Sequence, residues 1–343
     1  MRGVWIRRAI ALAALGVVVY LFWPLLKDIR AAAQLFRTAR WQWLAAAALL
    51  QCASYACLTW LNALALRPFS GRIGFLRLAL VLTAMAFITA AVPSAGASGI
   101  VLRARLLAKY GYTAEASTFT LLLELIFLVV GTVLVALFGL GYLLQIGQLS
   151  VQEITLLAAV VILAGTLVWV GWRLASNPLR SLRLLERLVA VWNRVAGRFR
   201  LKAMDPQAVA VRLEAFNRGL RELRAVPRWM FFAASAGRIL LDVATLGACF
   251  ALLGHLIRPD ILLISYGLIM IISSLAILPG GLGLADVSLP VVFNRLGVPG
   301  SLALAAGLTY RLLAFWLVRF IGFVSWQLLE GAAERGLKRG ENP

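Results

Sequence analysis

The chain has few of the residues that supply acid–base or metal chemistry. Its 343 residues include one histidine, three cysteines and 14 acidic residues, against 34 basic ones. Cys52, Cys57 and Cys249 fall inside apolar segments, and no Cys, His and carboxylate group has the spacing of a zinc site. A nucleophile elbow, a phosphate-binding loop and a dinucleotide fingerprint are also missing from the sequence. We therefore expect neither an enzyme nor a cofactor.

Long polar stretches are missing as well. Hydrophobic residues make up 62% of the chain, and the mean hydropathy is +0.90. Ordinary globular domains contain roughly 45–50% apolar residues, and a membrane-spanning helix needs about 20 in a row. We predict an all-α, polytopic bundle of six to eight spanning helices that forms one integral membrane domain, residues 1–343. The predicted membrane segments are 8–26, 41–64, 75–92, 118–144, 154–172, 229–253, 261–278 and 302–329.

The net charge of +20 lies mainly at the ends of apolar segments and in one loop. Residues 173–228 contain 13 Lys or Arg and four Asp or Glu, which predicts a cytoplasmic loop. Within it, residues 179–195 place a basic helical face opposite a Leu, Val and Trp face. This pattern fits a helix lying in the interface of an anionic leaflet, or a solvated helix packed on the bundle. Anionic lipid accounts for the charge, so no nucleic-acid partner is expected.

Proline and glycine interrupt two of the apolar regions. Region 75–110 is broken at Pro93–Gly99, and region 261–298 is broken at a Pro-Gly-Gly-x-Gly motif. Irregular backbone at membrane depth survives only when it is buried in protein or lines a cavity. Two such segments in the two halves of a chain indicate a transporter-type site, although ordinary loop turns also use these residues. If both regions are re-entrant hairpins, six crossings remain and both termini are cytoplasmic. The basic loop 173–228 is then also cytoplasmic, as its positive charge predicts.

Charged residues inside the apolar segments are few. Arg238 and Asp242 are four apart on one predicted helix, where they form either a structural ion pair or a phosphate-binding arginine with its resting counter-ion. Asp286 either caps the helix after the glycine break or faces a cavity, where it pairs with Arg311 or takes part in proton coupling. Arg311 lies mid-span, which predicts that it faces a cavity.

Arg103 and Arg105 follow the first break and fit either a clamp for a headgroup phosphate or a solvated loop. Glu124 is expected to pair with one of them. The full set of predicted substrate-binding residues is Arg103, Arg105, Arg238, Asp242, Pro279, Gly280, Gly281, Gly283, Asp286 and Arg311.

Four motifs occur together along nearly the whole chain. They are Val92-Pro93 with the glycines and Arg103 that follow, Leu278–Gly283 before an acidic residue, Leu296–Pro299, and Tyr310–Leu313 ahead of Arg319 and Gly322. In combination these motifs resemble the lysylphosphatidylglycerol synthase transmembrane-region family of flippase-like integral membrane proteins.

The resemblance implies a domain related to the part of multi-peptide-resistance-type proteins that moves aminoacylated phosphatidylglycerol across the bilayer. Stand-alone members are linked with polyprenyl-linked, hopanoid or cardiolipin lipids. Two departures affect which substrate can be carried over: this chain has Asp286 where the family often has Glu, and Gly96–Gly99 lacks the glutamate often present there. Since the soluble aminoacyl-transferase domain of true synthases is not found, synthase activity is not implied.

We therefore expect a flippase-like protein that translocates an anionic phospholipid or a lipid-linked intermediate in a bacterial plasma (inner) membrane. Its expected partners are membrane lipids, including polyprenyl- or hopanoid-type lipids, and a lipid-modifying enzyme. The alternative is a non-transporting scaffold or accessory subunit that recruits such an enzyme through residues 173–228.

Overall fold

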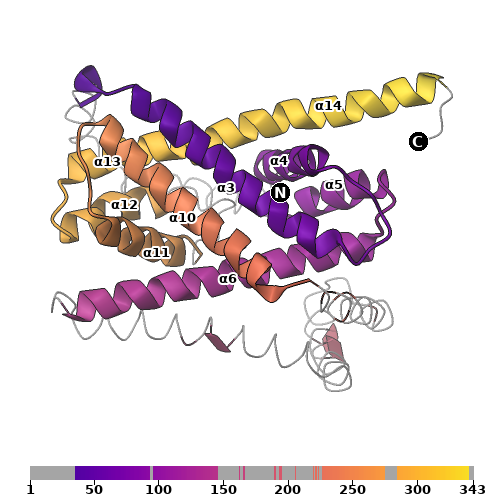
Figure 1. Ribbon diagram of the computed structural model, residues 1–343, viewed down its shortest axis with the longest axis horizontal. Helices are drawn as coiled ribbons and strands as arrows, with labels where there is room; N and C mark the ends of the chain where they lie inside the picture. Colours follow the sequence, from indigo (N-terminus) through magenta and orange to yellow (C-terminus); the bar gives the residue numbers. More distant parts are fainter. Residues whose placement is uncertain are drawn as a thin grey trace, which may run out of the picture. The chain divides into compact units, whose positions relative to one another are not determined.

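The computed structural model describes residues 35–92, 96–145, 226–274 and 284–339, together with single positions between 162 and 223 (Figure 1). In this part of the chain the regular structure is helical, without a strand, which confirms the predicted all-α class. The helices are η1 (Phe36–Thr38), α3 (Gln42–Leu66), α4 (Phe75–Ala91), α5 (Ala97–Ala108), α6 (Ala114–Gln145), α10 (Arg228–Leu252), α11 (Pro259–Ser274), α12 (Leu284–Arg295), α13 (Gly300–Arg311), η4 (Leu312–Leu317) and α14 (Val318–Arg339).

Helices α3, α6 and α10 begin and end within a few residues of the predicted segments 41–64, 118–144 and 229–253. Four of the described stretches are long and apolar enough to cross a membrane: Gln42–Leu66, Ala114–Thr132, Arg228–Leu252 and Gly300–Glu330. The predicted segment 8–26 lies outside the described residues, as do most of segment 154–172 and most of the basic loop 173–228.

The surfaces of these helices are apolar where a water-soluble protein would be polar. Among its described side chains, helix α6 exposes five large apolar ones, and α14 exposes Phe320, Phe323 and Leu328. Soluble monomers rarely expose contiguous apolar patches of this kind, whereas lipid tails accommodate them. The exposed residues of α6 are Leu122, Leu125, Leu128, Leu134 and Phe138.

Two pairs of short helices occupy the regions that proline and glycine interrupt. Helices α4 and α5 pack against each other, and so do α11 and α12. With 12 to 17 residues each, these helices are about 18–26 Å long, shorter than the ~30 Å hydrocarbon core of a bilayer. Helix α4 ends at Ala91, and Gly96, with φ of +87°, precedes α5.

The breaks themselves are only partly described. Pro93–Ala95 lie outside the described residues, as does the whole of 275–283 with Pro279, Gly280, Gly281 and Gly283. The chain resumes as helix at Leu284, which places Asp286 in the first turn of α12, although its side chain is not described.

The last predicted segment, 302–329, is helical throughout but not uniformly α-helical. Helix α13 begins after Pro299, a π-helical turn follows at Leu312–Leu317, and α14 continues from Val318. π-Helical turns are rare insertions in α-helices. A hydrophobic run predicts a helix here, but it does not predict this local change in hydrogen bonding.

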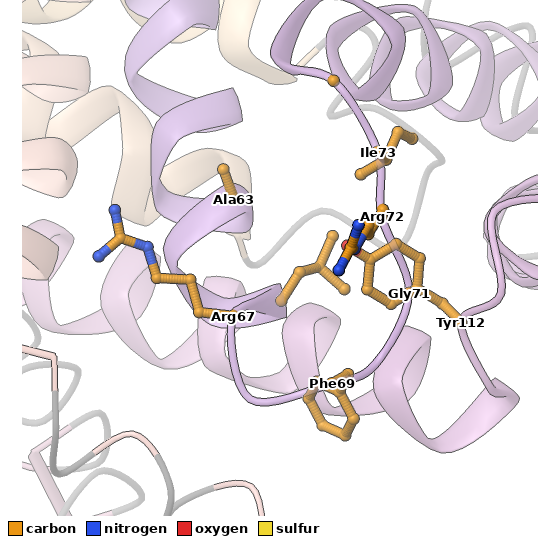
Figure 2. Close-up of a pocket in the computed structure, with 9 residues that line it drawn as sticks. Ala63, Arg67, Phe69, Gly71, Arg72, Ile73 and Tyr112 are labelled. Carbon is orange, nitrogen blue, oxygen red and sulfur yellow. The ribbon is translucent and has the colours of Figure 1, made fainter.

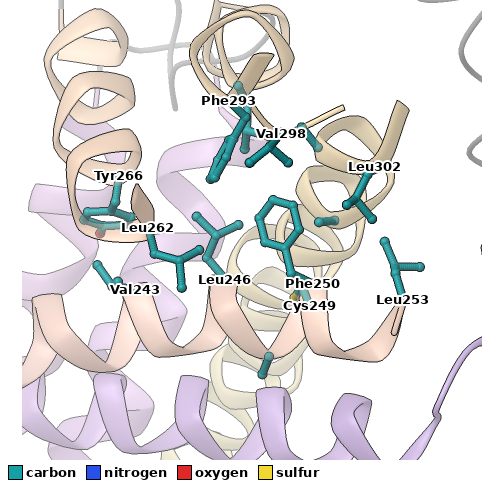
Figure 3. Close-up of a cluster of buried hydrophobic side chains, with 14 of the residues drawn as sticks. Val243, Leu246, Cys249, Phe250, Leu253, Leu262, Tyr266, Phe293, Val298 and Leu302 are labelled. Carbon is teal, nitrogen blue, oxygen red and sulfur yellow. The ribbon is translucent and has the colours of Figure 1, made fainter. Parts of the chain in front are cut away.

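The described chain divides into two compact units, which we describe separately. Unit 1 comprises the described parts of Met1–Ser54, Val135–Leu149 and Ile239–Val318. Its core packs α10 against α11, α12 and α13 (Figure 3). At the centre of this core, the ring centroids of Phe250 and Phe293 are 4.9 Å apart. Cys249 lies fully buried beside them and packs in this core.

Unit 2 comprises the described parts of Tyr55–Leu134, Ser150–Arg238 and Arg319–Pro343. One of its contacts brings α14 directly onto α4 at Gly322. A Cβ at Gly322 would overlap the backbone carbonyl of Thr83 and come within 2.8 Å of Phe87 Cβ. One turn further along, the hydroxyl groups of Thr83 and Ser325 are 3.0 Å apart. The absent side chain therefore permits backbone contact between the helices, as is common between membrane helices.

Candidate functional site

Arg103 is completely enclosed within unit 2. It lies on the buried face of α5, next to Leu102 and one turn from Leu106 and Leu107, and its exposed fraction is 0%. A guanidinium in such a place needs partners, because a buried charge without them is costly. The helical spacing of the apolar residues therefore turns Arg103 inward, towards the neighbouring helices.

Three polar side chains from two other helices bind this guanidinium. Arg103 Nη1 lies 3.2 Å from Glu124 Oε2 on α6. Arg103 Nη2 donates to Asn62 Oδ1 on α3 and to Thr120 Oγ1 on α6, each at 2.6 Å. Asn62 Nδ2 in turn donates to Glu124 Oε2 at 3.1 Å. The prediction that Glu124 pairs with one of the two arginines after the first break is confirmed.

Glu124 also forms an ion pair with a second arginine. Arg238 Nη1, on α10, lies 3.9 Å from Glu124 Oε1. The side chains of Glu124 and Arg238 are 22% and 27% exposed, whereas Arg103 is not exposed at all. Among the described residues, Glu124 rather than Asp242 is the carboxylate in contact with Arg238. Two guanidinium groups thus share one carboxylate, one of them enclosed and the other reachable from the surface.

Asp242 has a different environment, within unit 1. Its carboxylate accepts hydrogen bonds from Ser54 Oγ at 2.7 Å, Gln51 Nε2 at 3.3 Å and the Tyr266 hydroxyl at 3.1 Å. Its exposed fraction is only 8%. These partners are neutral donors from α3 and α11, so they stabilise the carboxylate by hydrogen bonding.

The remaining predicted site residues are placed as follows. Arg105 is two positions from Arg103, about 200° around the helix, and its side chain is 69% exposed and 3.6 Å from Glu330. Arg103 and Arg105 therefore do not form one clamp. Arg311 stacks over Phe315 in the next turn of its own helix, 5.0 Å from the ring centroid. The residues of the second glycine break and the Asp286 side chain lie outside the described part.

Sequence reasoning missed the uncharged members of both clusters. Asn62 and Thr120 bind Arg103, and Gln51, Ser54 and Tyr266 bind Asp242. Three of them, Gln51, Ser54 and Asn62, occur at spacings of three and eight within one apolar segment. Polar residues that recur at helical spacing share one helix face, and this was the signal available in the sequence.

Comparison with known protein families shows which family the chain belongs to. The sequence matches the family described as lysylphosphatidylglycerol synthase TM region over residues 8–322, nearly the whole chain. The chain belongs to this family. The match includes every residue of both polar clusters, and a search of curated proteins found no match. Membership in the lysylphosphatidylglycerol synthase TM-region family, together with the apolar helices, makes this an integral membrane protein of a family associated with lipid metabolism or transport.

Proposed function

We propose that this protein is a flippase-like translocator that moves an anionic phospholipid or a lipid-linked intermediate across the membrane. The observation that carries the proposal is the pair of arginines, Arg103 and Arg238, sharing Glu124 inside a helical membrane protein. Ionisable residues within a membrane domain are expensive and by default indicate function. Guanidinium groups suit a phosphate because their planar donors match its oxygens.

The three charged side chains have different roles in this proposal. Arg103, held by Asn62 and Thr120, is a fixed positive charge. Glu124 is the resting counter-ion, and Arg238, at the more exposed side, is the group that exchanges Glu124 for the arriving phosphate. The acyl chains remain in the surrounding lipid, so only the headgroup needs a polar route.

The short helix pairs supply that route in the proposal. We interpret α4–α5 and α11–α12 as re-entrant hairpins, because each of these helices is shorter than the hydrocarbon core. Re-entrant hairpins are compatible with a polar cavity at membrane depth. Family membership supports a location in a bacterial plasma membrane, with membrane lipids as the binding partners. The proposed transport includes no enzymatic step.

A reconstitution experiment tests the proposal. Purified protein is placed in vesicles with fluorescent anionic phospholipids or a polyprenyl-linked phosphate lipid, and the transfer rate between leaflets is measured. We expect wild type to exceed empty vesicles, and Arg238→Gln to slow transfer about tenfold, since a charge-assisted hydrogen bond contributes roughly 1.5–3 kcal/mol. The matched control is Arg258→Gln, because Arg258 precedes α11, is 71% exposed and pairs with Asp260 in the first turn of that helix.

Two outcomes would contradict the proposal. Wild-type protein that transfers none of these lipids faster than empty vesicles would remove its basis. Equal rates for Arg238→Gln and Arg258→Gln would remove the arginine pair as the headgroup site. If the protein proved inactive in vesicles and removal of residues 179–195 abolished its role in cells, the scaffold alternative would be favoured.

A further inference from the structure

A cavity separate from the arginine pair lies between two connecting loops of unit 2. The loop from α3 to α4 and the turn from α5 to α6 line an open surface pocket of about 470 Å³, within the usual volume range for a small-ligand pocket (Figure 2). Arg67, Arg72 and Tyr112 are among its lining residues, and the Arg103, Glu124 and Arg238 side chains are not. In Figure 2, Arg72 lies beside Tyr112, whereas the Arg67 side chain extends from the end of α3 away from Arg72 and Tyr112.

The wall of this pocket is held in place by close backbone packing. Gly71 lies flat against the ring of Tyr112, and a Cβ at Gly71 would approach the ring atoms to 2.5–2.7 Å. The Arg72 backbone N–H donates to the Tyr110 carbonyl at 3.1 Å. The Arg77 guanidinium lies 6.0 Å from the centroid of the Tyr110 ring. These contacts tie the two loops together, so the pocket is formed before any ligand arrives.

The charged residues that line the pocket, Arg67 and Arg72, are both basic. The Arg67 and Arg72 side chains are exposed, so a ligand reaches them without a rearrangement of the helices. Burial raises the pKa of the Tyr112 hydroxyl, which therefore stays protonated at neutral pH and adds no negative charge. The pocket is thus electrostatically suited to an anion.

Apolar side chains adjoin the pocket. Phe75 and Leu76 begin α4 directly after the lining residue Gly74, and they are 50% and 73% exposed. Cations next to exposed apolar side chains at the end of a membrane helix are the arrangement that binds a lipid headgroup at the membrane surface.

We propose that this pocket binds a phosphate group, with Arg67 and Arg72 as the charged ligands and Tyr112 as the fixed wall. The phosphate belongs either to the headgroup of an anionic lipid or to a soluble phosphate compound, and the adjoining apolar residues favour the lipid. This surface site is additional to the arginine pair. It does not depend on transport, because binding alone tests it.

The test is a binding measurement on the purified full chain in detergent. Native mass spectrometry and thermal shift are recorded with short-chain phosphatidic acid, with inorganic phosphate and with short-chain phosphatidylcholine. The variant is Arg67→Gln/Arg72→Gln, and the control is Arg37→Gln/Arg40→Gln, which removes the same charge from two exposed arginines of unit 1. Both variants change only exposed side chains, and their melting temperatures verify folding.

We expect phosphatidic acid to bind and the Arg67/Arg72 variant to weaken its binding about tenfold, with the Arg37/Arg40 variant close to wild type. Weakened binding of phosphatidic acid alone identifies a lipid site, and weakened binding of inorganic phosphate identifies a site for soluble phosphate. The proposal is overturned if neither anion is affected, if both variants weaken binding equally, or if phosphatidylcholine binds as well as phosphatidic acid.

Discussion

Arg103 depends on Glu124 more than on its neutral neighbours, because an enclosed guanidinium without a carboxylate retains an uncompensated charge. Breaking a buried ion pair by removing one partner costs about 3–5 kcal/mol. Replacing both partners by apolar residues of similar size is often neutral. Replacing Glu124 alone and replacing Arg103 and Glu124 together therefore separate the role of the ion pair in stability from its role in binding.

We predict that Glu124→Gln lowers the free energy of unfolding by about 3 kcal/mol. The double variant Arg103→Met/Glu124→Leu should regain most of this loss while losing lipid transfer in the vesicle assay. Thermal or denaturant unfolding in detergent measures the first effect. A single variant as stable as wild type would show that Glu124 does not compensate Arg103.

Charged residues in apolar segments could be found from the sequence, but most of their partners could not. Pairing of Glu124 with an arginine of the first break was predictable because few charges are available within the apolar segments. The partners of Asp242 were not, since Gln51 and Ser54 lie 191 and 188 positions away along the chain. Local spacing predicted Arg238 as its neighbour, whereas tertiary packing brings Glu124 to Arg238 instead.

Among the elements of unit 2, the contact of α14 with α4 leaves little room for added side-chain volume. Gly322 lies against the Thr83 carbonyl, so any side chain there must displace backbone rather than a flexible side chain. Overpacking of this kind costs about 1–3 kcal/mol, and displacement of α14 also breaks the Thr83–Ser325 hydrogen bond.

We predict that Gly322→Ala lowers the apparent melting temperature by about 2 °C or more, because about 1 kcal/mol shifts the melting temperature by roughly 2–4 °C in a domain of 150–250 residues and by somewhat less in a longer chain. Gly74→Ala is the control, since a Cβ there meets nothing within 4 Å. Equal melting temperatures for the two variants would contradict the close contact.

The boundaries of the long helices were predictable because a bilayer demands about 20 apolar residues. Phe75–Ala91 matches the predicted segment 75–92 because Gly74 and the Pro93 break bracket it. The π-helical turn at Leu312–Leu317 was not predictable. Its apolar residues fit an α-helix equally well, and only tertiary packing selects the wider turn.

For the whole molecule, the proposed re-entrant hairpin fixes which loops share a side of the membrane. The pocket already brings the loop 67–74 and the turn at Tyr112 together within unit 2. Their basic residues predict that both lie on the cytoplasmic side. A re-entrant α4–α5 pair returns to the side from which it entered, whereas a full crossing would leave position 94 on the opposite face.

We predict that cysteines introduced at Ser70 and Thr113, in a background without the three native cysteines, react with a membrane-impermeant thiol reagent only from the cytoplasmic side. Both positions are exposed. A cysteine at Ser94 should react slowly from either side. Rapid labelling of position 94 from the outer side would show that α4 crosses the bilayer and that the hairpin is wrong.

The enclosure of Arg103 also imposes an order on biogenesis. Asn62 has already been synthesised when α5 leaves the ribosome, but Thr120 and Glu124 have not. Until α6 follows, the guanidinium keeps its hydration shell, and α5 cannot settle beside α4. Enclosure of Arg103 requires α6 as well as α5, so we expect α5 to reach its final position only after α6 has been synthesised.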